Sequence, residues 1–188
     1  MKTYEIAQRL EGEMMASGHK PNRRYLGMSQ IYKAEADLIS QLRNGYTTGE
    51  RHQLLIYGMG YAFERIILEK LVAAGLIYAD SSRHLVASFD ERFKGHTDAE
   101  FTDGVLCEVK STTEERLARI ESSHNLPNQH YVQAQMYMHW GGYDLDRIVY
   151  VARDTGRVLV RILKYDARTA NNYNEKAKRI LATIDNYK

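Results

Sequence analysis

The sequence of 188 residues contains one cysteine, Cys107. A single thiol excludes an intrachain disulfide, a structural zinc site built from cysteines, and an iron–sulfur cluster held by four cysteines. We therefore expect no iron–sulfur cluster. Such sparse use of cysteine is consistent with a reducing, cytoplasmic location.

Long apolar runs are also missing. No stretch approaches the roughly 18 apolar residues of a membrane span, and the amino-terminal segment MKTYEIAQRLEGEMM mixes acidic residues into an amphipathic pattern. That segment therefore lacks the apolar core of a signal peptide. The sequence predicts a soluble protein without a membrane partner.

A strong excess of either charge is absent, since 26 Lys and Arg residues face 24 Asp and Glu residues. The net charge of +2 is compatible with a polyanionic partner but is weak evidence for one. The chain also has no internal repeat, low-complexity tract or linker. We expect a single domain over residues 1–188, with a helical portion over about 1–75 and a sheet with helices over about 76–188.

What the sequence does contain is an alternation of helical and strand-like patterns. Two segments, 95–110 and 147–165, have the alternation and the turn residues of β-hairpins. Together with the helices they predict an α/β fold, in which a central mixed β-sheet built from the two hairpins is flanked by helices. Apolar residues at helical spacing predict these helices over residues 4–16, 29–44, 61–74, 129–140 and 167–186.

The first hairpin, GHTDAEFTDGVLCEVK at 95–110, places charged residues among residues suited to a core. A two-residue turn would direct Asp98 and Glu108 to opposite faces. A three-residue loop over 102–104, with Gly104 in the left-handed conformation, would instead pair Asp98 with Glu108. We favour the three-residue loop, because every apolar residue then lies on one face and the charged residues lie on the other.

In the favoured arrangement Ala99 pairs with Cys107, and Asp98, Glu108 and Lys110 lie together on the charged face. Two carboxylates side by side repel each other unless a cation or a shared proton lies between them. Mg²⁺, which prefers oxygen ligands, is the natural occupant. The alternative is an ordinary solvated sheet face with an ion pair across the strands.

Two helices carry polar residues that break their apolar pattern. Glu64 lies three and four residues before Ile67 and Leu68, so it projects from the apolar stripe of its helix. A salt bridge to an arginine at the edge of the core is the alternative role. Gln133 and Tyr137 stand one turn apart on a later helix and form a ridge suited to binding a phosphate or supporting a metal ligand. Ordinary hydrogen bonding between helices is the alternative for this pair.

The ordered combination of these elements resembles a known family. Glu64 on a helix, GHTD with Asp98, EVK with Glu108 and Lys110, and then a Q-x-x-x-Y element resemble the PD-(D/E)XK nucleases. Within that superfamily the pattern is similar to the RecB-type branch, which includes phage exonucleases and CRISPR-associated nucleases. The resemblance covers most of residues 25–165.

Two positions depart from the pattern of the family. Tyr61 stands where many relatives have a histidine that contacts the metal, and Ala34 stands near the place of a cysteine that binds an iron–sulfur cluster. The resemblance therefore implies a metal site without that histidine and a protein without the cluster.

The resemblance implies a restriction-endonuclease-like core and a deoxyribonuclease that uses one or two Mg²⁺ or Mn²⁺ ions. Asp98, Glu108 and the backbone carbonyl of Val109 would be metal ligands, and Glu64 would hold a second ion or act through water. Lys110 would orient the attacking water or stabilise charge on the phosphorus.

DNA is the partner that the resemblance implies. Gln133 and Tyr137 would steady the site and touch the DNA backbone. Lys20, Arg23 and Arg24 are candidate phosphate contacts, and a solvated loop is the alternative interpretation of this basic cluster.

The pattern favours an exonuclease of recombination, repair or phage DNA processing, acting as a homo-oligomer or with a recombination or repair partner. Two alternatives share the same core: a structure-specific endonuclease, and a catalytically silent DNA-binding or assembly subunit. The intact set of Asp98, Glu108 and Lys110 argues against the silent subunit.

Overall fold

The computed structural model describes residues 25–45, 51–123 and 125–186, together with the helical positions Glu5, Gln8, Arg9 and Gly12. Most of the first predicted helix, 4–16, and the basic residues Lys20, Arg23 and Arg24 lie outside the described residues. No helix in the described part of the chain is long and apolar enough to cross a membrane.

Helices and strands occur in groups along the described chain. The helices are the 3-10 helix η1 (Met28–Gln30), α2 (Glu35–Asn44), α3 (Arg51–Ala73), α4 (Glu114–Ser122), α5 (Asn128–Gly141) and α6 (Ala167–Asp185). The strands are β1 (Leu26–Gly27), β2 (His84–Ala87), β3 (Asp90–His96), β4 (Ala99–Glu100), β5 (Leu106–Thr112), β6 (Leu145–Ala152) and β7 (Val158–Lys164).

The larger sheet contains four strands in the described residues, in the order β4-β5-β6-β7. β5 and β6 are parallel, with Glu108 beside Ile148, and the two outer pairs are antiparallel. This arrangement confirms the predicted central mixed sheet built from two hairpins. Parallel neighbours need a crossover connection, and α4 and α5 lie in the crossover between β5 and β6.

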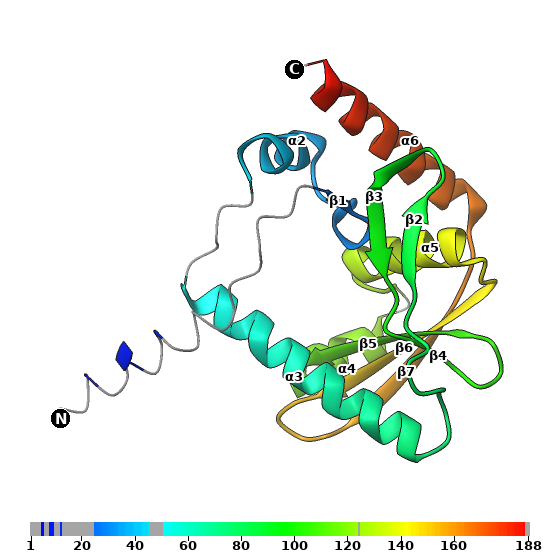
Figure 1. Ribbon diagram of the computed structural model, residues 1–188. Coiled ribbons are helices and arrows are strands. Elements are labelled where there is room, and N and C mark those ends of the chain that lie inside the picture. Colours follow the sequence, from blue (N-terminus) through cyan, green and yellow to red (C-terminus); the bar gives the residue numbers. More distant parts are fainter. Residues whose placement is uncertain are drawn as a thin grey trace.

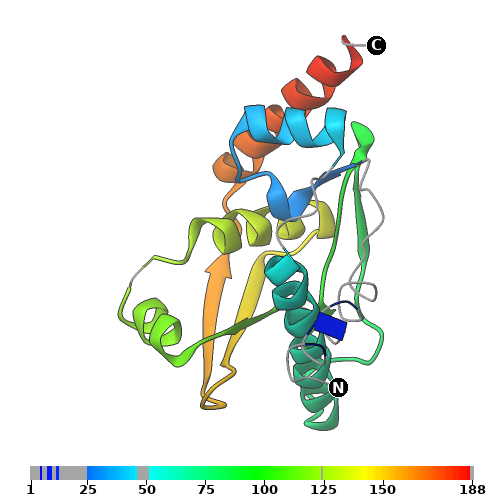
Figure 2. The same ribbon diagram turned by 90° about the vertical axis from the view of Figure 1, so that its left-hand side faces the viewer.

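β5 is covered on both faces, because successive side chains of a strand point to opposite sides. Leu106 belongs to the core that α5 forms with the sheet. Cys107 and Val109 belong to the other core, where Ile67 and Leu68 of α3 pack against them. Figure 2 shows the long helix α3 running alongside the sheet. The charged face of the first hairpin is therefore covered rather than solvated.

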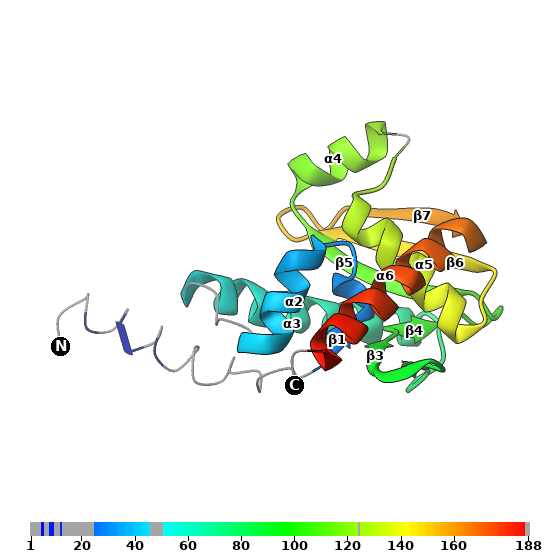
Figure 3. The same cartoon turned by 90° about the horizontal axis from the view of Figure 1, so that it is seen from above.

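The helices α6 and α2 lie on the side of α5 away from the larger sheet (Figures 1 and 3). Ala177, Ile180 and Leu181 of α6 are buried, as the predicted apolar stripe requires. Leu38 of α2 joins the same core. α5 is thus held between this helical layer and β5.

The loop of the first hairpin has the predicted three-residue form. Ala99 lies opposite Cys107, the Phe101 N–H donates to the Val105 carbonyl at 2.8 Å, and Gly104 has a φ of +80°. The predicted length of the hairpin is wrong, because β4 has only 2 residues.

A second sheet, ordered β1-β3-β2 in the described residues, was not predicted. β3 contains Gly95 and His96, which the sequence pattern assigns to the first hairpin, and it pairs antiparallel with β2 and parallel with β1. Its sequence DERFKGH is mostly polar, and Phe93 is its one buried residue. Such a strand lacks the regular alternation that identifies strands in a sequence.

Three helix predictions also need correction. α3 begins at Arg51, ten residues before the predicted start at 61. Ser29 lies in the 3-10 helix η1, and α2 begins only at Glu35. α4 was not predicted. The side chain of Thr113 caps its amino terminus, and the helix has few buried residues from which a pattern could be recognised.

We expect Gly104→Val to lower the free energy of unfolding by roughly 1–3 kcal/mol, because a β-branched residue resists a positive φ. No atom lies within 4 Å of a Cβ built at Gly104, so the cost comes from the backbone and not from a clash. Gly104→Asn is the matched control, since Asn tolerates this conformation. Urea unfolding measures both variants, and equal stabilities of Gly104→Val and wild type would contradict the loop conformation.

Candidate functional site

The centre of the site is the Glu108 carboxylate, which is 1% exposed on the α5 face of β5. Its Oε1 accepts from Lys110 Nζ at 2.5 Å and from Gln133 Nε2 at 2.5 Å. Lys110 comes from the same strand, two residues on, and Gln133 comes from α5. Two elements far apart in the sequence therefore fix one carboxylate oxygen.

Asp98 is placed by the bend between the two sheets. Just before it, Thr97 Oγ1 accepts from the Arg83 N–H at 2.8 Å, and the Thr97 N–H donates to the Arg83 carbonyl at 3.0 Å. Asp98 Oδ2 then accepts from the Val109 N–H at 2.7 Å. Since the N–H and C=O of a strand residue point to the same side, the Val109 carbonyl also faces Asp98.

Burial and mutual repulsion dominate the electrostatics of these groups. Burial raises the pKa of Glu108 well above its usual value, and the charge of Asp98 raises it further. Burial also raises the pKa of Asp98, against the opposing influence of Lys110. Burial alone would lower the pKa of Lys110, but Glu108 and Asp98 raise it, so the ammonium stays charged. Asp98, Glu108 and Lys110 thus act on each other directly, as the three-residue loop predicts.

One oxygen of this cluster has no partner. Glu108 Oε2 is buried and makes no hydrogen bond within the described part of the chain. A buried acceptor without a donor is costly, and a cation satisfies it as well as a donor does. The donor set of two carboxylates and a backbone carbonyl is all oxygen, which fits Mg²⁺ or Mn²⁺.

The fit to a metal ion relies on water as well as on protein. Among the described residues, no three His, Cys, Asp or Glu side chains converge closely enough to hold an ion by themselves. Mg²⁺ commonly keeps several waters and uses only one or two carboxylates. Asp98, Glu108 and the Val109 carbonyl are therefore a sufficient set for such a partly hydrated ion.

The predicted ridge of α5 lies at the site. Tyr137 is 4% exposed, and burial raises its pKa, with Glu108 and Asp98 adding to the rise. Gly95 of β3 makes room for this ring, because a Cβ at Gly95 would lie 2.6 Å from Tyr137 Cε1. The glycine of GHTD therefore lets β3 and α5 approach closely beside Asp98.

His130 is half-buried one turn before Gln133, and both of its ring nitrogens have partners. Its Nδ1 lies 2.8 Å from Tyr150 Oη, and its Nε2 lies 3.0 Å from Gln129 Nε2. Burial lowers the pKa of His130 to about 3, and the charges of Lys110 and Arg116 lower it as well. The imidazole is therefore neutral at physiological pH.

Glu64 is half-buried on α3, which packs on the opposite face of β5 from Glu108 and Lys110. Ile67 and Leu68, its neighbours along the helix, are among the residues in that contact. The assignment of Glu64 to a second ion stays a prediction. Tyr61, where relatives have histidine, is 48% exposed.

Asp146, the second residue of β6, was not predicted from the sequence. Asp146 is 0% exposed, lies beside Leu106 in the parallel register, and shares the α5 face with Glu108. Neither of its carboxylate oxygens has a hydrogen-bond partner among the described residues. Burial raises its pKa to about 8, against the influence of Lys110. The available signal was its parity with the core residues Ile148 and Tyr150 along the strand.

No protein-family model matches this sequence, and no curated protein matches it. Among solved structures, the chain is similar to an alkaline exonuclease (LHK-Exo) from Laribacter hongkongensis, with a TM-score of 0.68 and 15% identity over 94% of this chain and 93% of that chain. The structure of LHK-Exo in complex with dAMP matches with a TM-score of 0.67 and 14% identity, over the same 94% and 93%.

A phage-related exonuclease from Haemophilus somnus is also similar, with a TM-score of 0.56 and 14% identity over 87% of this chain and 94% of that chain. These likenesses show that the chain has the fold of exonucleases. The fold is consistent with the PD-(D/E)XK superfamily, which the motifs of the sequence resemble.

We expect Gly95→Ala to lower both stability and activity, because the added methyl group would displace Tyr137 or Met28 from their places beside Asp98. The loss of stability should be about 1–3 kcal/mol, the usual range for overpacking. Gly60→Ala is the control, since no atom lies within 4 Å of a Cβ there and alanine favours a helix. Thermal unfolding and nuclease assays compare the two, and an unaffected Gly95→Ala enzyme would exclude the close approach.

We expect Asp146→Asn to flatten the pH dependence of stability in metal-free buffer. The folded-state pKa of Asp146 is raised from 3.8 to about 8, so its contribution to stability is complete below the unfolded pKa and is lost as pH rises through about 8. Wild type should lose up to about 1.4 kcal/mol per pH unit through this group between those values. Asp144→Asn, at an exposed position, is the control, and parallel curves for wild type and Asp146→Asn would refute the shift.

Proposed function

We propose that this chain is a metal-dependent deoxyribonuclease that hydrolyses DNA phosphodiester bonds as an exonuclease. The observation that carries the proposal is the buried Glu108 Oε2 beside Asp98 and Lys110, which has no hydrogen-bond partner among the described residues. Such a group favours the binding of a divalent cation. The ordered motifs around it resemble those of PD-(D/E)XK nucleases. The fold shared with exonucleases supports the same function.

Asp98, Glu108 and the Val109 carbonyl would hold Mg²⁺ or Mn²⁺, and Glu64 would contribute to a second ion or act through water. A divalent ion at this place supplies Lewis acidity and lowers the pKa of bound water. The residues of the chain supply the arrangement: the Val109 N–H fixes one oxygen of Asp98, and Gln133 Nε2 fixes one oxygen of Glu108.

Lys110 would serve the attacking water and the phosphate. Its Nζ lies against Glu108 Oε1, so the ammonium is already inside the site and needs no rearrangement of β5. From that position it would orient the water and offset the negative charge that develops on the phosphate oxygens. Tyr137 and Gln133 would steady this geometry and touch the DNA backbone.

DNA as the substrate is proposed from the same resemblance, together with the names of the structural neighbours. One of those neighbours was solved with dAMP, a deoxynucleotide of the kind that an exonuclease releases. Lys20, Arg23 and Arg24 remain proposed phosphate contacts. The proposed role is in recombination, repair or phage DNA processing in the cytoplasm. The protein would act there as a homo-oligomer or with a partner protein.

The deciding experiment incubates the protein with end-labelled linear DNA and with closed circular DNA in Mg²⁺ or Mn²⁺. Digestion of linear DNA alone supports the exonuclease. Cutting of closed circles would replace it with an endonuclease, and inactivity on both, with DNA binding retained, would leave a catalytically silent subunit.

We expect Glu108→Gln and Lys110→Ala to be nearly inactive for different reasons. Glu108→Gln keeps the size of the side chain but removes the ligand charge, so divalent binding should weaken together with cleavage. Lys110→Ala keeps both carboxylates and should retain metal binding while losing a factor on the order of 10² to 10³ in turnover.

Calorimetric metal titration and single-turnover cleavage distinguish the two variants, with Lys164→Ala, at an exposed position of β7, as the control. Two results would defeat the proposed roles. One is a wild-type protein that binds no divalent ion even with DNA present, and the other is a Lys110→Ala protein that cleaves at the wild-type rate.

A further inference from the structure

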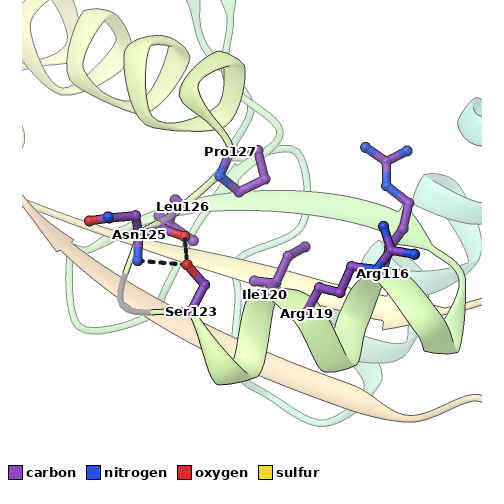
Figure 4. Close-up of a pocket in the computed structure, with 7 residues that line it drawn as sticks. All are labelled: Arg116, Arg119, Ile120, Ser123, Asn125, Leu126 and Pro127. Carbon is purple, nitrogen blue, oxygen red and sulfur yellow. Dashed lines mark hydrogen bonds between the residues drawn. The ribbon is translucent and has the colours of Figure 1, made fainter.

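A surface groove lies between α4 and the segment that leads into α5. It has a volume of about 370 Å³, which is within the range of pockets that take a small ligand. Its apolar floor is formed by Ile120, Leu126 and Pro127, and its rim carries Arg116 and Arg119. Figure 4 shows both arginines on the side of α4 that faces Pro127 and α5.

The two arginines differ in their present contacts. Arg119 pairs with Glu115 one turn earlier on α4, and both side chains are largely exposed. Such exposed pairs contribute little and exchange readily for a better anion. The exposed guanidinium of Arg116 makes no hydrogen bond or close ion pair within the described residues. At least one bidentate donor on the rim is therefore available to an anion.

The walls of the groove are fixed by a third arginine. Arg161 Nη2, from β7, donates to the carbonyls of Ile120, Glu121 and Ser123 at 2.6, 2.7 and 3.0 Å. These bonds satisfy carbonyl groups at the end of α4 and hold that end in place. The groove is thus a formed feature of the fold, bounded by a helix end that is tied to the sheet.

The groove borders the candidate catalytic site. α4 begins two residues after β5 ends, so Arg116 follows Lys110 by six residues, and Pro127 precedes Gln133 by six residues at the start of α5. The six residues of α5 from Asn128 to Gln133 span about 9 Å along the helix axis. The charges of Lys110 and Arg116 both lower the pKa of His130, on the first turns of α5, so both cations lie in the neighbourhood of this helix end. A strand bound at Lys110 therefore passes within reach of the groove.

We propose that this groove holds one nucleotide of the DNA strand next to the bond that is cut. The sugar and base would lie against Ile120, Leu126 and Pro127, and Arg116, with Arg119, would bind the phosphate. Cationic side chains that follow the phosphate backbone hold single strands without reading sequence, and the aliphatic floor of this groove would contact the sugar and base without selecting among bases. This inference rests on the proposed function, because it takes DNA to be the substrate.

The test measures binding of a fluorescent single-stranded oligonucleotide by the full-length Lys110→Ala protein, which is expected not to cleave it, at 50 to 200 mM salt. Adding Arg116→Ala should weaken binding several-fold and reduce the slope of log K against log salt by about one, since one phosphate contact is lost. Arg116→Lys should keep most of the slope. In the otherwise wild-type enzyme, Arg116→Ala should raise KM while kcat changes less than about twofold.

Arg179→Ala is the matched control, because Arg179 is a 60% exposed arginine on α6 that pairs with Glu35, away from α4 in Figures 1 and 3. If Arg116→Ala binds DNA as well as the control at every salt concentration, the proposed role of the groove is overturned. Cleavage of DNA by the wild type would still leave the nuclease proposal standing. A wild-type protein that binds DNA through Arg116 but never cleaves it would support the groove and end the nuclease proposal. A wild-type protein that binds no DNA would overturn both.

Discussion

The Glu108 carboxylate meets Lys110 Nζ and Gln133 Nε2 on one oxygen and leaves the other unpartnered among the described residues. Taking an ionised carboxylate out of water costs several kcal/mol unless charge and hydrogen bonds replace the lost hydration. The replacement here comes from two elements, β5 and α5, so their relative position is fixed by chemistry as well as by packing. The small residue Gly95 in β3 serves the same constraint, because a side chain there would push Tyr137 and α5 away.

The charge balance of this region is the reason why a cation site is proposed there. Among the described residues, the ammonium group of Lys110 is the cation that acts on all three of the buried carboxyl groups Asp98, Glu108 and Asp146. Burial raises the pKa of all three carboxyl groups, and a neighbouring carboxylate adds to the rise for Glu108 and Asp146, so without a further cation these groups favour protonation. A divalent ion relieves the same excess without a proton. Protons and metal ions are therefore expected to compete for this site.

The fold connects the candidate site directly to the groove beside α4. β5 ends beyond Lys110 and leads directly into α4, and α5 begins one and a half turns before Gln133. The groove between α4 and the start of α5 is thus built from the same two segments that carry the candidate catalytic residues. A DNA strand that followed the proposed path would meet carboxylates, then an ammonium group, then guanidinium groups, in the order in which these residues occur from β5 to α4.

Short-range regularities of the sequence determined the core of the site. The three-residue loop, the positive φ of Gly104 and the pairing of Ala99 with Cys107 follow from the alternation of apolar residues over a few positions, because the register of a tight hairpin is a local property. The same local spacing placed Gln133 and Tyr137 on one side of α5, where Gln133 donates to Glu108 and Tyr137 lies near enough to feel its charge. The central mixed sheet followed from two such hairpins.

The second sheet, α4 and the buried acid Asp146 were decided by tertiary structure alone, because these features depend on which elements pack together. The polar strand β3 is a strand only by pairing with β1 and β2, and α4 is held by Arg161 from a distant strand. Asp146 resembles an ordinary residue at the beginning of a strand, and it becomes a buried acid only because β6 lies beside β5 under α5. A sequence specifies the alternation of side chains along each strand. Whether a face is removed from solvent, however, is determined by the element that packs on it.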